Sequence, residues 1–289
     1  MSLHVLCCAV FLLLIAPPAL LSQERSSLLQ AERFAAQLSS DSGFAHAARS
    51  AFDRSAILLW PTAPVVSGTA ELEKFLRLHP TDSLRLTWQP LGVRLAKDSS
   101  LGTSWGIAVA SSRVVPVAPR LGRYIAMWRR DPDRWRIVAL VFIGIETPGR
   151  ATRWAGLPLA RAPSEPSGAA RPFVSADIAF ARLAGDSGAA VAFRAYAADD
   201  AVSFGGGSVL VQGPVAISRA VSGPDQWRWH PVAAGAASEG DLGWTVGEAT
   251  IVDRDGKPNH SKYLTVWTRE ADGRVRFLVD GGNARPANP

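Results

Sequence analysis

The chain has 289 residues, a length that fits one large domain or two ordinary ones, because domains usually hold about 100 to 200 residues. With 47% hydrophobic and 19% charged residues, the composition is that of a globular protein and excludes a disordered or fibrous one. The net charge of +6 comes mainly from scattered arginines rather than from a basic cluster, which argues against nucleic acid as a partner.

The N-terminus has the pattern of a secretory leader. An uninterrupted apolar stretch over residues 5–15 is followed by prolines and small residues, and a polar run begins at Gln23. This pattern predicts a signal peptide over residues 1–22 and an exported protein, either periplasmic, in the cell envelope or secreted. The stretch is short for a spanning helix of about 20 residues, so we expect no stable membrane insertion after cleavage. An uncleaved anchor stays open, because residues 1–4 hold no Lys or Arg.

Both cysteines, Cys7 and Cys8, lie in this leader. A mature chain without them has no disulfide, no thiolate nucleophile and no Cys-based metal site. The sequence also lacks zinc-type His spacing, a Walker loop and a nucleotide-binding Gly fingerprint. We therefore predict that the protein uses no metal and no cofactor.

The rest of the chain repeats itself. Asp41-Ser42-Gly43 recurs 145 residues later as Asp186-Ser187-Gly188. Further matches in the same order are Trp88 with Trp229, Leu101 with Leu242, and Tyr124 with Tyr263. These colinear matches predict two copies of one domain, over residues 26–146 and 173–289, with a Pro- and Gly-rich linker over residues 147–172.

Each copy begins with an Ala-rich segment whose apolar residues have helical spacing, over residues 26–54 and 173–199. Gly43 and Gly188 are expected to break these helices. The elements expected next in the two copies are a short strand over 56–60 and 201–204, a short helix over 70–78 and 214–221, and three closing strands with a final turn at 131–133 and 271–273. Helices followed by mostly antiparallel strands predict an α+β fold.

Three segments of the second copy, with fainter equivalents in the first, carry a family resemblance. They are the closing hairpin over 261–283, the junction at Asp199-Asp200-Ala201-Val202 and the central strand over 241–248. In these segments the chain resembles the SnoaL-like domains of the nuclear transport factor 2-like superfamily. The resemblance implies two tandem cone-shaped domains, each a curved, mostly antiparallel sheet wrapped on N-terminal helices, with an apolar pocket at one end.

Members of that superfamily include isomerases, dehydratases, cyclases and epoxide hydrolases, and others only bind or assemble. Many pair through the outer face of the sheet, so the resemblance also implies an intrachain pair of the two copies or a homo-oligomer. Steroid-type isomerisation is disfavoured, because the family's Asp base falls at Gly205 and near Trp60, and its Tyr falls near Ile178.

Three residues of the second copy are candidate catalytic groups: His230, Glu248 and Asp280. An imidazole titrates near neutral pH, which makes His230 a candidate acid or base, although an exposed or hydrogen-bonded structural histidine is the alternative. Glu248 shares a strand face with apolar residues, and Asp280 lies where the family's pocket has its mouth. The first copy has Gln89, Ile107 and Leu140 at these three positions.

The candidate ligand-binding residues are Asp200, Trp229, Trp244, Tyr263 and Trp267. Several of these aromatic positions recur in the first copy, so packing in the core or at an interface is the alternative. We expect the second copy to bind a small, mostly apolar molecule and the degenerate first copy to be its structural partner. A cofactor-free lyase, isomerase or hydrolase, or a non-catalytic envelope interaction module, remains an alternative.

Overall fold

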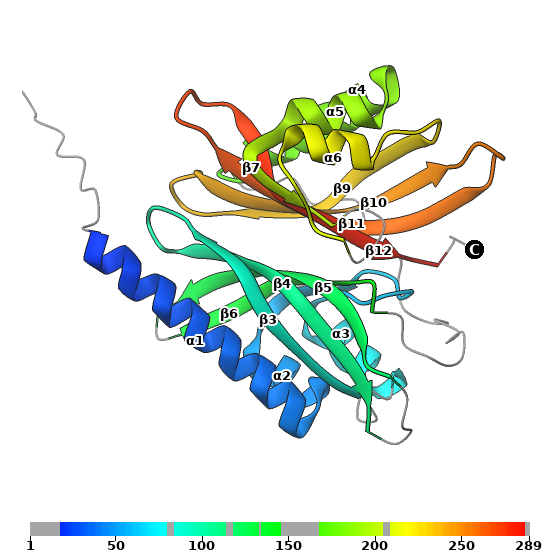
Figure 1. Ribbon diagram of the computed structural model, residues 1–289. Helices are drawn as coiled ribbons and strands as arrows, with labels where there is room; N and C mark the ends of the chain where they lie inside the picture. The colour runs from blue at the N-terminus through cyan, green and yellow to red at the C-terminus, as the bar shows by residue number, and fades with distance from the viewer. Residues whose placement is uncertain are drawn as a thin grey trace, which may run out of the picture.

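The computed structural model describes residues 18–79, 84–113, 118–132, 134–145, 168–204 and 209–286. This part of the chain forms two α+β units, each with a six-stranded sheet and three helices (Figure 1). Most of the predicted leader and of the predicted linker lies outside the described residues, as does Gly205. The predicted α+β fold class is confirmed.

The two units have the same order of elements. The first contains α1 (Pro18–Ser42), α2 (Phe44–Ala51), β1 (Phe52–Leu59), β2 (Val66–Ser67), α3 (Gly68–Leu78), β3 (Leu84–Leu95), β4 (Leu101–Ser112), β5 (Arg120–Asp131) and β6 (Arg134–Ile143). The second contains α4 (Arg171–Ser187), α5 (Ala189–Tyr196), β7 (Ala197–Ser203), β8 (Val211–Gln212), α6 (Pro214–Ala220), β9 (Gln226–Ala236), β10 (Leu242–Val252), β11 (Pro258–Arg269) and β12 (Val275–Ala284).

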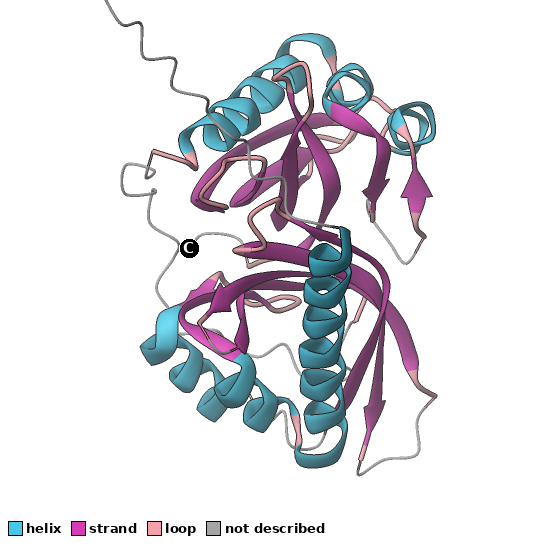
Figure 2. Cartoon of the chain, turned by 90° about the vertical axis from the view of Figure 1, so that its left-hand side faces the viewer, coloured by secondary structure: helices cyan, strands magenta, loops and turns pink. Residues whose placement is uncertain are grey.

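Both sheets are mixed and follow the same topology. The strand orders are β2-β1-β6-β5-β4-β3 and β8-β7-β12-β11-β10-β9. Only the β1–β6 and β7–β12 pairs are parallel. Figure 2 shows how strongly the long strands bend, with the helices packed along them. The strands that follow the short helix supply most of each sheet.

The glycine breaks between the paired helices are confirmed. Gly43 and Gly188 have φ angles of 92° and 90°, a region that residues with a Cβ rarely adopt. Each glycine ends one helix and precedes the next, so α2 and α5 turn back toward the sheet.

The prediction of three closing strands per copy is wrong, because each copy has four. The edge strands β3 and β9 carry Pro90 and Pro231 in their interiors. The sheet tolerates proline there, since an edge strand or a bulge does not need every backbone N–H. In both pairs the register shifts beside the proline.

The two sheets pack against each other, with the helices of each unit on the far side (Figure 1). Buried apolar side chains from both units form one cluster, whose members include Ile125, Val141, Ile143, Leu264, Val266 and Val279. Two hairpins bracket this interface symmetrically. The backbone N–H of Lys97 donates to Asp241 at 2.9 Å, and that of Glu239 donates to Asp98 at 3.3 Å. The interface therefore joins equivalent surfaces of the two units.

Candidate functional site

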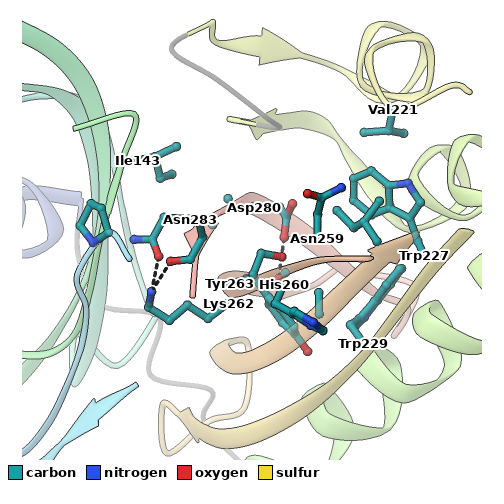
Figure 3. Close-up of a pocket in the computed structure, with 18 of the residues that line it drawn as sticks. Ile143, Val221, Trp227, Trp229, Asn259, His260, Lys262, Tyr263, Asp280 and Asn283 are labelled. Atoms are coloured by element: carbon teal, nitrogen blue, oxygen red, sulfur yellow. Dashed lines mark hydrogen bonds between the residues drawn. The ribbon is translucent and has the colours of Figure 1, made fainter. Parts of the chain in front are cut away.

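A cavity of about 350 Å³ opens on the concave side of the second sheet (Figure 3). Strands β9 to β12 form its floor, and α4 and α5 contribute to its roof. Most of its wall is apolar, with aromatic and aliphatic side chains that include Phe180, Phe193, Val221, Trp227, Trp229 and Ile251. Such a wall suits a small apolar molecule.

One residue at the place of the cavity differs in size between the two units. The pairing of Tyr124 with Phe142 in the first sheet corresponds to the pairing of Tyr263 with Gly282 in the second. Gly282 therefore stands where the first unit has a phenylalanine. Gly282 lines the cavity and has no side chain to match the ring of Phe142.

The first unit is packed with aromatic rings at this place. The Phe142 ring lies 5.8 Å, centroid to centroid, from the rings of Phe44, Trp60 and Trp88. The four rings thus form one closely packed cluster. The second unit keeps a tryptophan, Trp229, at the position of Trp88, but it has Gly282 at the position of Phe142.

The same register places a carboxyl group in the cavity. Thr265 pairs with Asp280 on β11 and β12, where the first sheet pairs Ala126 with Leu140. The Thr265 hydroxyl donates to Oδ1 of Asp280 at 2.7 Å. Burial raises the pKa of Asp280 to about 7; the hydrogen bond from Thr265 opposes this shift, and the nearby Asp177 adds to it.

A second carboxyl group, Asp177 on α4, lies behind the cavity wall and was missed from the sequence. Its side chain is fully buried. The indole N–H of Trp229 donates to Oδ1 at 2.9 Å, and the hydroxyl of Tyr263 donates to Oδ2 at 2.9 Å. Burial raises the pKa of Asp177 to about 6, although its hydrogen bonds oppose that rise. Burial also raises the pKa of Tyr263 well above its usual value, so this hydroxyl is neutral.

The first unit has an equivalent pair of a buried acid and a tyrosine. The Tyr124 hydroxyl donates to Oε1 of Glu32 on α1 at 2.5 Å, and Ser104 donates to the same oxygen at 2.7 Å. Burial raises the pKa of Glu32 to about 7. A buried acid and its tyrosine partner thus recur in both units. Their duplication indicates a structural role for the pair.

A sequence signal for these acids was present. Glu32 and Asp177 are separated by the same 145 residues as the repeated Asp-Ser-Gly, and both lie on the buried face of a helix. An acidic residue on such a face needs polar partners, which the tyrosines supply.

Among the predicted residues, the structure brings Asp280, Tyr263 and Trp229 together at the cavity. It places His230 elsewhere: its side chain is exposed on β9, on the opposite face of that strand from Trp229. Glu248 is buried, but it does not line the cavity, and its carboxylate lies 3.4 Å from the guanidinium of Arg285.

The other predicted ligand-binding residues also lie away from the cavity. Trp244 packs in the apolar cluster between the sheets. Trp267 is fully buried in the second core, where its indole N–H donates to Thr245 at 2.8 Å. Asp200 is exposed and forms an ion pair with Arg94 of the first unit at 2.6 Å. Packing and interdomain contact account for these three side chains.

Within the described ranges, no three His, Cys, Asp or Glu side chains are grouped so that they could hold a metal ion. None of the helices in that part of the chain is long and apolar enough to cross a membrane.

No protein-family model matches the chain, and no curated protein matches it. Solved structures match it over less than half its length. One is a nuclear transport factor 2-like protein with a cystatin-like fold from Novosphingobium aromaticivorans, 18% identical with a TM-score of 0.38, where the match covers 47% of this chain and 90% of that protein. Another, from Salmonella enterica, is 14% identical with a TM-score of 0.35, covering 45% and 97% of the two chains.

A third is a ketosteroid isomerase from a Mycobacterium species, 18% identical with a TM-score of 0.33, covering 38% of this chain and 91% of that one. These likenesses concern the fold alone. The predicted tandem arrangement of two α+β domains is confirmed, because the described residues form two units that each have a six-stranded sheet with its own helices.

Proposed function

We propose that the second domain binds a small, mostly apolar molecule that carries one polar group, and that Asp280 binds this group. The observation that carries the proposal is the cavity itself, because its wall is mostly apolar and it holds a single carboxylic acid side chain, Asp280. A carboxyl group in such a wall fixes the orientation of a ligand that the apolar surface alone would hold loosely.

The charge state of Asp280 decides which polar groups it accepts. With a pKa of about 7, the carboxyl is present in both forms near neutral pH. Its charged form accepts a hydrogen bond from a hydroxyl group, and its neutral form donates one to a carbonyl group. Alcohols and ketones with compact ring systems are therefore the ligand class we expect.

Binding of 2-naphthol tests the proposal, with 2-methoxynaphthalene as a matched probe that cannot donate a hydrogen bond. Quenching of Trp227 and Trp229 fluorescence and isothermal titration calorimetry both report on binding. Asp280→Asn should weaken 2-naphthol binding by about tenfold, the equivalent of about 1.4 kcal/mol, and leave 2-methoxynaphthalene unchanged.

A variant that fills the cavity supplies the control. Ala249 lies on the cavity floor, and Ala249→Phe should abolish binding of both probes without unfolding the domain, as circular dichroism would check. If neither probe binds in a saturable way, or if Ala249→Phe binds both as the wild type does, the proposal is wrong.

A second candidate function is cofactor-free proton transfer of the isomerase, lyase or hydrolase kind. The pKa of Asp280 favours it, because a general base works best when its pKa lies near the operating pH. The Asp280 carboxylate would remove a proton from the carbon beside a ligand carbonyl and return it to the resulting enolate.

Hydrogen exchange on a ketone tests this candidate directly. In D₂O the protein should speed the loss of the α-protons of 2-tetralone, followed by NMR, and Asp280→Asn should remove the acceleration. Binding of 2-tetralone without accelerated exchange would leave ligand binding as the function and refute the catalytic candidate.

We also propose that the protein is exported. The pattern of residues 1–22 supports this, and the mature chain would begin near Gln23. Glu24, just beyond that point, forms an ion pair with Arg130 at 3.0 Å, so α1 keeps this contact after cleavage. Expression in a bacterial host and N-terminal sequencing of the periplasmic fraction test the proposal, which an intact leader in the cytoplasmic fraction would overturn.

A further inference from the structure

The cavity of the second domain has a wall that belongs to the first domain. Pro61 and Thr62, on the turn after β1, line it, together with residues 143–145 at the end of β6. Figure 3 shows Ile143 on one side of Asp280 and Val221 on the other. A ligand beside Asp280 would therefore lie between two domains.

This wall is fixed by one side chain of the second domain, Asn283 on β12. Its amide nitrogen donates to the backbone carbonyl of Leu59 at 2.8 Å and to that of Phe142 at 2.7 Å. These two carbonyls belong to neighbouring strands of the first sheet, β1 and β6. One amide group thus holds the ends of both strands that supply the wall.

Asn283 is in turn held by Lys262, which is completely buried. The ammonium group of Lys262 donates to Oδ1 of Asn283 at 2.5 Å and to the carbonyl of Ala284 at 2.8 Å. The amide oxygen is therefore occupied, and both amide N–H groups point to the first domain. A buried lysine is unfavourable unless it is hydrogen-bonded, so this arrangement specifies one orientation of Asn283.

The turn that carries Thr62 is strained. Thr62 has a φ angle of 63°, although a β-branched residue rarely adopts the left-handed region. Its backbone N–H donates across the domain boundary to the carbonyl of Ala284 at 2.9 Å. Strain of this kind persists only where the surrounding contacts hold it, and here the contact is with the other domain.

The first domain has different residues at the positions of Lys262 and Asn283. The register that pairs Lys262 with Asn283 pairs Arg123 with Ile143 in the first sheet. Ile143 fits closely against β12, since a Cβ added to Gly281 would meet its Cδ1 at 2.6 Å. The two domains therefore contribute different side chains to the interface beside the cavity, Asn283 from the second domain and Ile143 from the first.

We infer that the first domain completes the binding site, that Ile143 limits the length of ligand the cavity accepts, and that Asn283 is the residue that positions this wall. The inference rests on the proposed binding function. Because a ligand in the cavity would contact residues of both domains, docking of the wall and binding of the ligand should each strengthen the other.

Two fused-ring alcohols of different length, 2-naphthol and 2-anthrol, test the role of Ile143. Ile143→Ala should raise the affinity for 2-anthrol relative to 2-naphthol by at least about tenfold, because the shortened side chain extends the cavity. Ile125→Ala is the matched control. Ile125 is buried in the same interdomain cluster but does not line the cavity, so its truncation should leave the ratio unchanged.

The role of Asn283 is tested by amide hydrogen exchange of the full chain. In the wild type, 2-naphthol should slow exchange at the Thr62 amide, whose hydrogen bond crosses the boundary. In Asn283→Ala this protection should be lost and the affinity for 2-naphthol should fall about tenfold.

The outcomes separate this inference from the function on which it rests. If 2-naphthol binds and Asp280→Asn weakens it, but Ile143→Ala leaves the ratio unchanged and Thr62 gains no protection, the second domain binds alone and the inference fails. If 2-naphthol does not bind, the proposed function fails as well.

Discussion

Replacing Glu32 by glutamine should remove part of the pH dependence of stability. Burial raises the pKa of Glu32 from 4.5 to about 7, so the folded protein keeps a proton that the unfolded chain releases at lower pH. The stabilisation is fully present below pH 4.5 and is lost as the pH rises through about 7. A rise of about 2.5 in pKa, at about 1.4 kcal/mol for each pKa unit, corresponds to about 3.5 kcal/mol.

Glutamine keeps an oxygen to accept from Tyr124 and Ser104 but does not titrate. Urea unfolding of both proteins between pH 5 and pH 8, followed by tryptophan fluorescence, gives the free energy of unfolding at each pH. Between pH 5 and 6.5 the wild type should lose about 1.4 kcal/mol per pH unit more than Glu32→Gln does. Between pH 5 and pH 8, the free energy of unfolding should therefore fall less for the variant than for the wild type. Parallel pH profiles for the two proteins would refute the reasoning.

Three further predictions follow from the same structure. Phe142→Ala should destabilise the first domain by about 3 to 5 kcal/mol in urea unfolding, because the aromatic cluster loses its central ring, and an equal stability would contradict the packing described. Gly188→Ala should lower the free energy of unfolding by about 1 to 2 kcal/mol, because Gly188 has a positive φ. Gly185→Ala, within α4 and with open space around it, should raise that free energy by up to about 1 kcal/mol. If the two changes have the same sign, the helix break at Gly188 does not depend on its positive φ. The affinity for 2-naphthol should rise as the pH increases through about 7, since the charged Asp280 carboxylate accepts a hydrogen bond from its hydroxyl group. Calorimetry at pH 6 and pH 8 checks this, and equal affinities at the two pH values would contradict it.

Much of the fold could be predicted because its local signals agree with each other. Gly43 and Gly188 interrupt helical patterns at equivalent places, and the repeated order of elements supports each assignment in the other copy. The strand count failed where a local rule conflicts with tertiary context. Pro90 and Pro231 argue against a strand in the sequence, but an edge position and a bulge accommodate them in the sheet.

The candidate site could be predicted only in part. Alternation along β11 and β12 places Tyr263 and Asp280 on the concave face, and both were candidates from the sequence. His230 is polar and titratable, but the same alternation, counted from Trp229, directs it outward. Ile143 as part of the wall could not be found from a pattern, because it depends on how two domains pack.

The duplication explains which of these polar groups belong to the scaffold. The buried acid and its tyrosine occur in both domains, so selection for a ligand in one domain cannot be the reason for the pair. The two domains differ at two positions on one face of the last strand. The first domain has Phe142 and Leu140 there, whereas the second has Gly282 and Asp280, so the second lacks that ring and gains a carboxyl group. The first domain keeps the ring of Phe142 at this place, and the ends of its strands can serve as a fixed wall. On the proposal above, we therefore regard the two domains as one binding unit, in which the second domain holds the cavity beside its own packed core and the first domain supplies part of the wall.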